Sequence, residues 1–87
     1  MKIWFKIWKD GRIGRSTVIE DYSEETRTHK VFNALDAACR ELDLARPIWL
    51  DAAVNEFKRH ARCRFGQDAF IEQIEFDYLE MHVLEED

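Results

Sequence analysis

This sequence of 87 residues contains little of what marks linkers, disulfide scaffolds or membrane segments: one Pro, three Gly and two Cys. So little Gly and Pro excludes a low-complexity linker. No apolar run approaches the roughly 20 residues that a membrane helix needs. The first apolar stretch is interrupted by Lys6 and Lys9, unlike the core of a signal peptide. We therefore expect a cytoplasmic protein with no membrane partner.

Apolar and aromatic residues, by contrast, are plentiful, at 46% and 13% of the chain. This content predicts a single folded domain over residues 1–87. The net charge of −5 is unevenly distributed, because residues 1–15 hold five Lys or Arg while residues 68–87 hold eight Asp or Glu and no Lys or Arg. Such segregation indicates either an electrostatic surface for a partner or pairing between these two segments of the same chain.

Residues 2–9, KIWFKIWK, alternate as a β-strand does. Ile3, Phe5 and Ile7 fall on one face, and the lysines and tryptophans fall on the other. The β-branched and aromatic content also favours a strand. A returning strand is expected over residues 15–21, RSTVIED.

The dipeptide Asp10-Gly11 predicts a hairpin between these strands, because a type I′ turn needs positive φ angles. A two-residue loop would place Lys6 opposite Arg15, a like-charge pair that lowers stability. We therefore favour a four-residue loop ending at Ile13. Its register places Trp8 opposite Arg15 and Trp4 opposite Ile19.

Residues 23–44 have the period of a core-facing helix, with Ser23 or Thr28 as its N-cap. Its apolar face consists of Val31, Phe32, Leu35, Ala38, Cys39 and Leu42. The chain then turns at Pro47, because the residue before a proline is pushed toward extended backbone.

A second helix is expected from the N-cap Asp51 to a stop at Gly66. Its apolar face consists of Ala53, Val54, Phe57, Ala61 and Phe65.

The last segment is rich in strand-forming residues, but its parity changes midway. A β-bulge near Tyr78-Leu79 would reconcile the two halves; a helix beginning at Asp68 is the alternative. The predicted fold class is α+β, in the order ββααβ, with a three-stranded antiparallel sheet and two helices on one face.

Four stretches give the chain a family resemblance: TVIEDYSEETRTHKVFNALD, RPIWLD, EFKRHA and FIEQIEFDYLE. They resemble a family of small bacterial proteins of unassigned function that is associated with integrative and other mobile elements. The resemblance runs from end to end of the chain. It implies an accessory role in a mobile element and offers no catalytic residues to carry over.

The first strand carries the most distinctive candidate site, because a strand that buries Ile3, Phe5 and Ile7 directs Trp4 and Trp8 to the other face. Two exposed indoles form an apolar patch of the kind that marks interfaces. The predicted partner interface, shared with another protein or with a second copy in a homodimer, consists of Trp4, Trp8, Ile19, Lys6 and Arg15. Alternatively, the last strand or the segment PIWL covers the indoles.

The stretch EFKRHARCRFGQD concentrates positive charge on the second expected helix. Lys58, Arg59 and Arg62 form one arc of that helix, which is either a solvated face or a contact for an anion or nucleic acid. Nucleic-acid binding is the less favoured alternative, because the rest of the chain is acidic.

A metal site or an active site finds little support in the sequence. His60 and Cys63 lie three residues apart, but a structural zinc site needs about four ligands. A Cys63–His60 pair lacks an accompanying oxyanion element or phosphate-binding glycine loop. We expect no disulfide between Cys39 and Cys63, no cofactor, no metal, no small-molecule substrate and no enzymatic activity.

The sequence thus favours a non-enzymatic protein-interaction factor, an accessory of a mobile element that docks on another protein. One specific form of this hypothesis is an inhibitor of a host defence nuclease whose Asp and Glu side chains imitate phosphates. The alternative is a nucleic-acid-binding regulator that uses the basic helix face.

Overall fold

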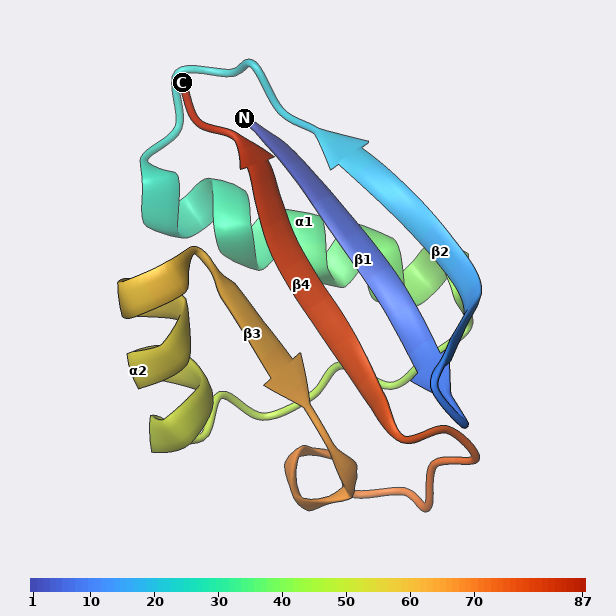
Figure 1. Cartoon of the computed structure of the whole chain (residues 1–87). Helices are drawn as coiled ribbons and strands as arrows, with labels where there is room; N and C mark the ends of the chain where they lie inside the picture. The colour runs from blue at the N-terminus through green and yellow to red at the C-terminus, as the bar shows by residue number, and fades with distance from the viewer.

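The computed structural model describes residues 1–87 and has an α+β fold around a four-stranded antiparallel sheet (Figure 1). The sheet order is β2-β1-β4-β3. The expectation of three strands was therefore wrong by one. In chain order the elements are β1 (Lys2–Lys9), β2 (Arg12–Glu20), α1 (Arg27–Glu41), α2 (Asp51–His60), β3 (Arg62–Phe65), the 3-10 turn η1 (Gln67–Ala69) and β4 (Tyr78–Glu85).

The β1–β2 hairpin closes through the two-residue loop Asp10-Gly11, whose φ angles are +53° and +76°. The favoured four-residue loop was wrong. The clash that argued against the short loop is avoided by a bulge in β2, after which Lys6 faces Ser16 instead of Arg15. The Arg15 guanidinium donates instead to the backbone carbonyl of Leu42, at 2.6 Å.

The bulge also changes which β2 side chains lie beside the tryptophans. Ile19 pairs with Ile3 on the core side of the sheet, and Val18 pairs with Trp4. The prediction that Trp4 lies opposite Ile19 was therefore wrong. The extra residue of the bulge shifts β2 by one position relative to β1, which turns Ile19 to the other face of the sheet.

Helix α1 begins later than the sequence indicated. Its N-cap is Thr26, whose hydroxyl accepts a hydrogen bond from the backbone N–H of His29 at 3.2 Å. Neither Ser23 nor Thr28 has this role. The predicted face is buried at Val31, Leu35, Ala38, Cys39 and Leu42, whereas Phe32 remains 46% exposed.

Helix α2 ends at His60, whereas the predicted stop at Gly66 would have let it continue to Phe65. The helix ends early because Ala61 adopts the left-handed region at φ +53°. The chain continues as β3, in which Cys63 and Phe65 are buried and the intervening arginines are exposed. At the other end, the N-cap is Leu50 rather than Asp51, which is the first helical residue.

The last segment forms a strand only from Tyr78 onward. Before it, Asp68 lies in a single 3-10 turn and Ile71 is 91% exposed, so neither a helix from Asp68 nor a long bulged strand forms. β4 has regular alternation, and the irregularity in its pairing with β1 lies between Lys2 and Ile3.

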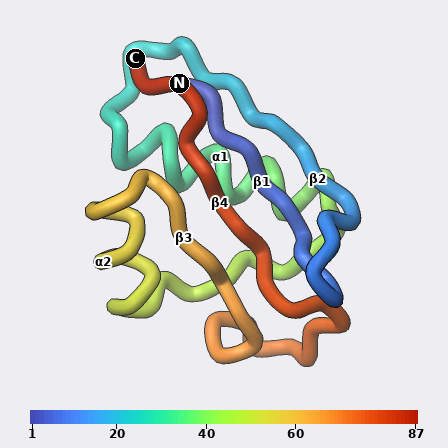
Figure 2. The backbone as a smooth tube through the Cα atoms, in the orientation of Figure 1, coloured from blue at the N-terminus to red at the C-terminus, as the bar shows by residue number.

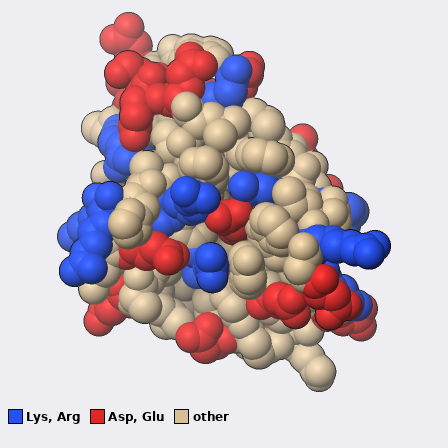
Figure 3. All heavy atoms as spheres, in the orientation of Figure 1, with Lys and Arg blue, Asp and Glu red and all other residues tan.

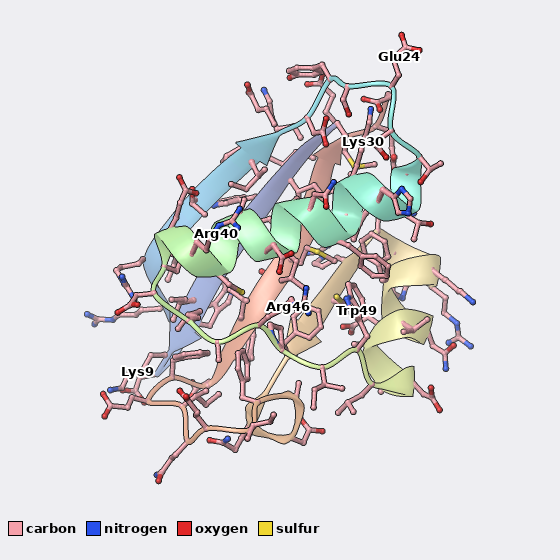
Figure 4. All side chains as sticks on the ribbon, turned by 180° about the vertical axis from the view of Figure 1, so that it is seen from behind. Lys9, Glu24, Lys30, Arg40, Arg46 and Trp49 are labelled. Atoms are coloured by element: carbon pink, nitrogen blue, oxygen red, sulfur yellow. The ribbon has the colours of Figure 1, made fainter.

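The hydrophobic core lies between the sheet and α1, which crosses behind β1 and β4 (Figure 1; Figure 4, from the helix side). Its most deeply buried large side chains are Phe5, Phe65, Ile3, Leu35, Leu79, Met81 and Cys63. α2 lies beside the β3 edge, and Trp49 joins it to the core through edge-on contacts with Phe57 and Phe65. In Figure 2 no backbone segment crosses the front of β1 and β4, so the second face of the sheet is open.

Candidate docking surface on the open sheet face

The face of the sheet opposite the helices, called the open face below, consists of side chains from all four strands. The pairing of the strands determines which residues share this face, since directly paired residues lie on the same side of a sheet. The open face is formed by Trp4, Lys6, Trp8, Ile13, Ser16, Val18, Arg62, Arg64, Tyr78, Glu80 and His82.

A buried ion pair lies at the centre of this face. The ammonium of Lys6 is 2.9 Å from the carboxylate of Glu80, and the two residues are only 6% and 5% exposed. The indole N–H of Trp8 donates to the same carboxylate at 2.9 Å, and the guanidinium of Arg62 lies 3.8 Å from it. Burial by itself would raise the pKa of Glu80, but the hydrogen bonds from Lys6 and Trp8, together with the nearby positive charges, outweigh it and lower the pKa.

The tryptophans cover this pair in the absence of a helix. Lys6 lies over the ring of Trp4, 4.0 Å from its centroid, and the hydrogen bond from Trp8 closes the opposite side. The two indoles therefore have fixed positions, with part of each surface in contact with solvent.

Further apolar and aromatic surface surrounds the indoles. The ring of Tyr78 lies 6.2 Å from that of Trp8 and has the guanidinium of Arg64 over it at 4.9 Å. On the β2 side, Ile13 and Val18 are 42% and 45% exposed. The result is an apolar surface with basic side chains along its β3 edge, where Figure 3 shows Lys and Arg gathered.

His82 lies between Trp4 and Arg62 in the same row of the sheet. Its Nδ1 is buried and has no hydrogen-bond partner. Burial lowers the pKa of His82, as do the charges of Arg62 and Lys6, while Glu80 opposes the shift. The imidazole is therefore neutral at pH 7.

The structure brings together three of the five residues predicted as an interface: Trp4, Trp8 and Lys6. Ile19 lies on the core side, and Arg15 reaches toward the end of α1. Neither the last strand nor the segment PIWL lies over the indoles; instead β4 pairs beside β1.

The predicted interface did not include the residues that β3 and β4 add to the open face: Tyr78, Glu80, His82, Arg62 and Arg64. A signal for them was present. The alternation in Arg62-Cys63-Arg64-Phe65 has the period of a strand, and the parity of β4 is regular once the strand is taken to begin at Tyr78.

The predicted basic arc is divided between two elements. Lys58 and Arg59 lie in the last turn of α2, whereas Arg62 lies on β3 and joins the open face. A single helical surface for nucleic acid, as the sequence indicated, is therefore not formed.

The cysteines are free and buried in the core. Burial raises the pKa of Cys63 to about 12 and that of Cys39 to about 11, so both thiols are protonated at neutral pH. His60 is exposed at the end of α2, while Cys63 is fully enclosed. These positions provide no activated thiol for nucleophilic chemistry.

Neither a metal-binding cluster nor a membrane-spanning helix is found. No group of three or more His, Cys, Asp or Glu side chains is arranged to hold a metal ion. Neither helix has the length and apolar character needed to traverse a bilayer.

Comparison with known proteins found no match to a family model, to a curated protein or to a solved structure.

Proposed function

We propose that this chain is a small binding protein that acts by docking another protein on the open face of its sheet. The observation that supports this function is the position of Trp4, Trp8 and Tyr78, partly exposed on a sheet face that has no helix over it. Exposed apolar patches with polar rims mark protein–protein contacts, and Trp and Tyr are enriched among the residues that dominate binding energy.

The mechanism we propose is occupancy by a preformed surface. The Lys6–Glu80 pair fixes both indoles before any partner arrives, through the stacking contact with Trp4 and the hydrogen bond from Trp8. A rigid surface loses less side-chain freedom on association, so more of the contact energy appears as affinity.

The family resemblance leads us to propose a partner encoded by a mobile element or by its host, such as a defence nuclease. Phosphate mimicry by the acidic C-terminal segment is not required for this role. Much of that acidity is matched within the chain, because four of its carboxylates pair with cations. These pairs are Glu80 with Lys6, Glu85 with Lys2, Glu86 with Arg27 and Asp87 with Lys30.

The test uses residues that are exposed on the open face and do not support the buried pair. The double variant Ile13→Lys/Val18→Lys adds two charges to the proposed contact and leaves Trp8 bonded to Glu80. Ile71→Lys is the matched control, because Ile71 is 91% exposed and lies outside this face.

Wild type and variants are used to capture partners from host lysate, and their mass in solution is measured by light scattering. We expect the double variant to fold, as shown by circular dichroism, and to lose the captured partner or the self-association that Ile71→Lys retains. Capture and mass unchanged in a folded double variant would show that the open face is not the docking surface.

A second candidate function is single-stranded nucleic-acid binding on the same face. Arg62 and Arg64 favour it, because both are exposed beside the aromatic side chains of the central strands. Such an arrangement allows bases to stack on rings while arginines contact phosphates. Binding of a labelled oligo-dT or oligo-U that weakens with salt and with Arg62→Ser/Arg64→Ser would support this function over protein docking.

A further inference from the structure

A separate apolar groove lies on the helix side of the molecule, between α1 and α2. It has a volume of about 250 Å³ and is open to solvent. Trp49, labelled in Figure 4, lies in the segment just before α2 and lines this groove. The apolar lining residues are Val31 and Phe32 of α1, Val54 and Phe57 of α2, and Trp49.

Aromatic contacts connect the residues that line this groove. Trp49 makes edge-on contacts with Phe32 at 6.1 Å and with Phe57 at 6.0 Å. Phe32 is 46% exposed although it follows the buried Val31, because it faces the gap between the helices instead of the sheet. The groove is therefore a preformed apolar surface that the fold does not fill.

The rim of the groove is basic, and of its two cations, Arg27 and Lys58, only Arg27 is paired with a carboxylate. The guanidinium of Arg27 donates two hydrogen bonds to Glu86, at 2.9 and 3.2 Å, and lies 5.1 Å from the ring centroid of Phe57. Lys58 makes no ion pair with any carboxylate of the chain. One uncompensated positive charge therefore stands at the edge of an apolar hollow, with Thr28 also at the rim.

We propose that this groove binds a small amphiphilic carboxylate, an alkyl or aryl group with one terminal anion. The hydrocarbon would lie against Phe32, Val54 and Phe57, and the carboxylate would reach Lys58. An apolar hollow with a few polar groups at one end is the usual form of a small-molecule site. A water molecule occupies about 30 Å³ in the liquid, and a methylene group is of similar size, so the groove holds roughly eight heavy atoms. The proposal is independent of the open face.

Octanoate, used below its micelle concentration, is a suitable probe, because its alkyl chain fits the volume of the groove while its carboxylate can lie at the rim. Binding is followed by the amide and indole N–H resonances of the ¹⁵N-labelled protein. We expect saturable shifts at Thr28, Val54, Lys58 and the Trp49 indole, with little change at Trp4 and Trp8. Octan-1-ol, which lacks the charge, should bind about tenfold more weakly.

Lys58 and Arg59 are neighbours in α2, and replacing each of them by Met gives a pair of matched variants. Lys58→Met should weaken octanoate binding about tenfold and leave octan-1-ol binding nearly unchanged. Arg59→Met removes a charge from the same turn of α2 but does not line the groove, so it should retain the affinity of the wild type. Equal affinity of both variants, shifts spread over the open face, or shifts that do not saturate would each overturn the proposal.

Discussion

The ammonium of Lys6 lies 2.9 Å from the carboxylate of Glu80, buried on a sheet face that no helix covers. The two residues face each other across β1 and β4, in segments of opposite charge at the two ends of the chain. The two oppositely charged segments thus pair in part, through Lys6 with Glu80 and Lys2 with Glu85. The Lys6–Glu80 pair also fixes the side chains that we propose as the docking surface.

Removing one member of this pair should be strongly destabilising. Glu80→Gln keeps the size of the side chain and an acceptor for Trp8, but leaves Lys6 buried without an anion. An unpaired buried charge costs roughly 3–5 kcal/mol, so we expect a loss of at least about 3 kcal/mol. Urea unfolding measures the loss.

Two further variants test whether this loss comes from the unpaired charge. Arg46→Met breaks an exposed pair with Asp36 and should cost less than about 1 kcal/mol. Lys6→Met/Glu80→Leu replaces both charges with apolar groups and should be more stable than Glu80→Gln. A Glu80→Gln loss no greater than that of Arg46→Met would contradict the burial of the pair.

Stability should decrease in two steps as the pH falls. The pKa of His82 is lower in the folded chain than its ordinary value of 6.5, so below that pH the unfolded chain binds the proton first and stability declines. The pKa of Glu80 is likewise below its ordinary 4.5, so a second decline begins near that pH. Urea midpoints measured between pH 7.5 and pH 3.5 should show a smaller first step in His82→Gln; an unchanged first step would exclude His82 as its source.

Leu35→Ala tests the packing of α1 on the sheet. Leu35 is 1% exposed and among the largest fully buried side chains, so its truncation should cost roughly 2–5 kcal/mol. Asn33→Ala, on the exposed side of the same helix, should change stability by less than about 0.5 kcal/mol. Similar values for the two variants in urea unfolding would mean that α1 presents a different face to the core.

The hairpin can be tested at two glycines that differ in backbone conformation, Gly11 in the loop and Gly14 in β2. Gly11 has φ +76°, where a Cβ is strained, so Gly11→Ala should lower stability by about 1–2 kcal/mol. Gly14 has an ordinary φ, and a Cβ there would meet only the carbonyl of Ile7 at 3.6 Å, an ordinary contact. Gly14→Ala should therefore be neutral or stabilising; a loss equal to that of Gly11→Ala in thermal unfolding would contradict the two-residue loop.

Both thiols should be unreactive in the folded protein. Cys39 and Cys63 are buried and protonated at neutral pH, so their reaction with Ellman's reagent should wait for unfolding. A cysteine introduced by Ile71→Cys provides the exposed reference, because that position is 91% exposed. Reaction of Cys63 as fast as that reference would restore it as a candidate nucleophile.

Local patterns in the sequence were enough to define the faces of β1 and α1. Ile3, Phe5 and Ile7 are buried as the alternation predicted, and Val31, Leu35 and Ala38 are buried as the helical period predicted. Asp10-Gly11 was also a sufficient signal for the hairpin, because its φ angles suit one turn type. In each case the signal is contained in a few adjacent residues.

The tertiary structure alone decided the bulge, the fourth strand and most of the open face. Phe57, Ala61 and Phe65 have the spacing of one helical face, yet Phe65 belongs to β3. A strand of four residues has almost no stability until β4 supplies its hydrogen bonds, and β4 is separated from it by the loop over residues 66–77. Which residues join Trp4 and Trp8 on the open face therefore depends on strand pairing between distant segments, which no local period encodes.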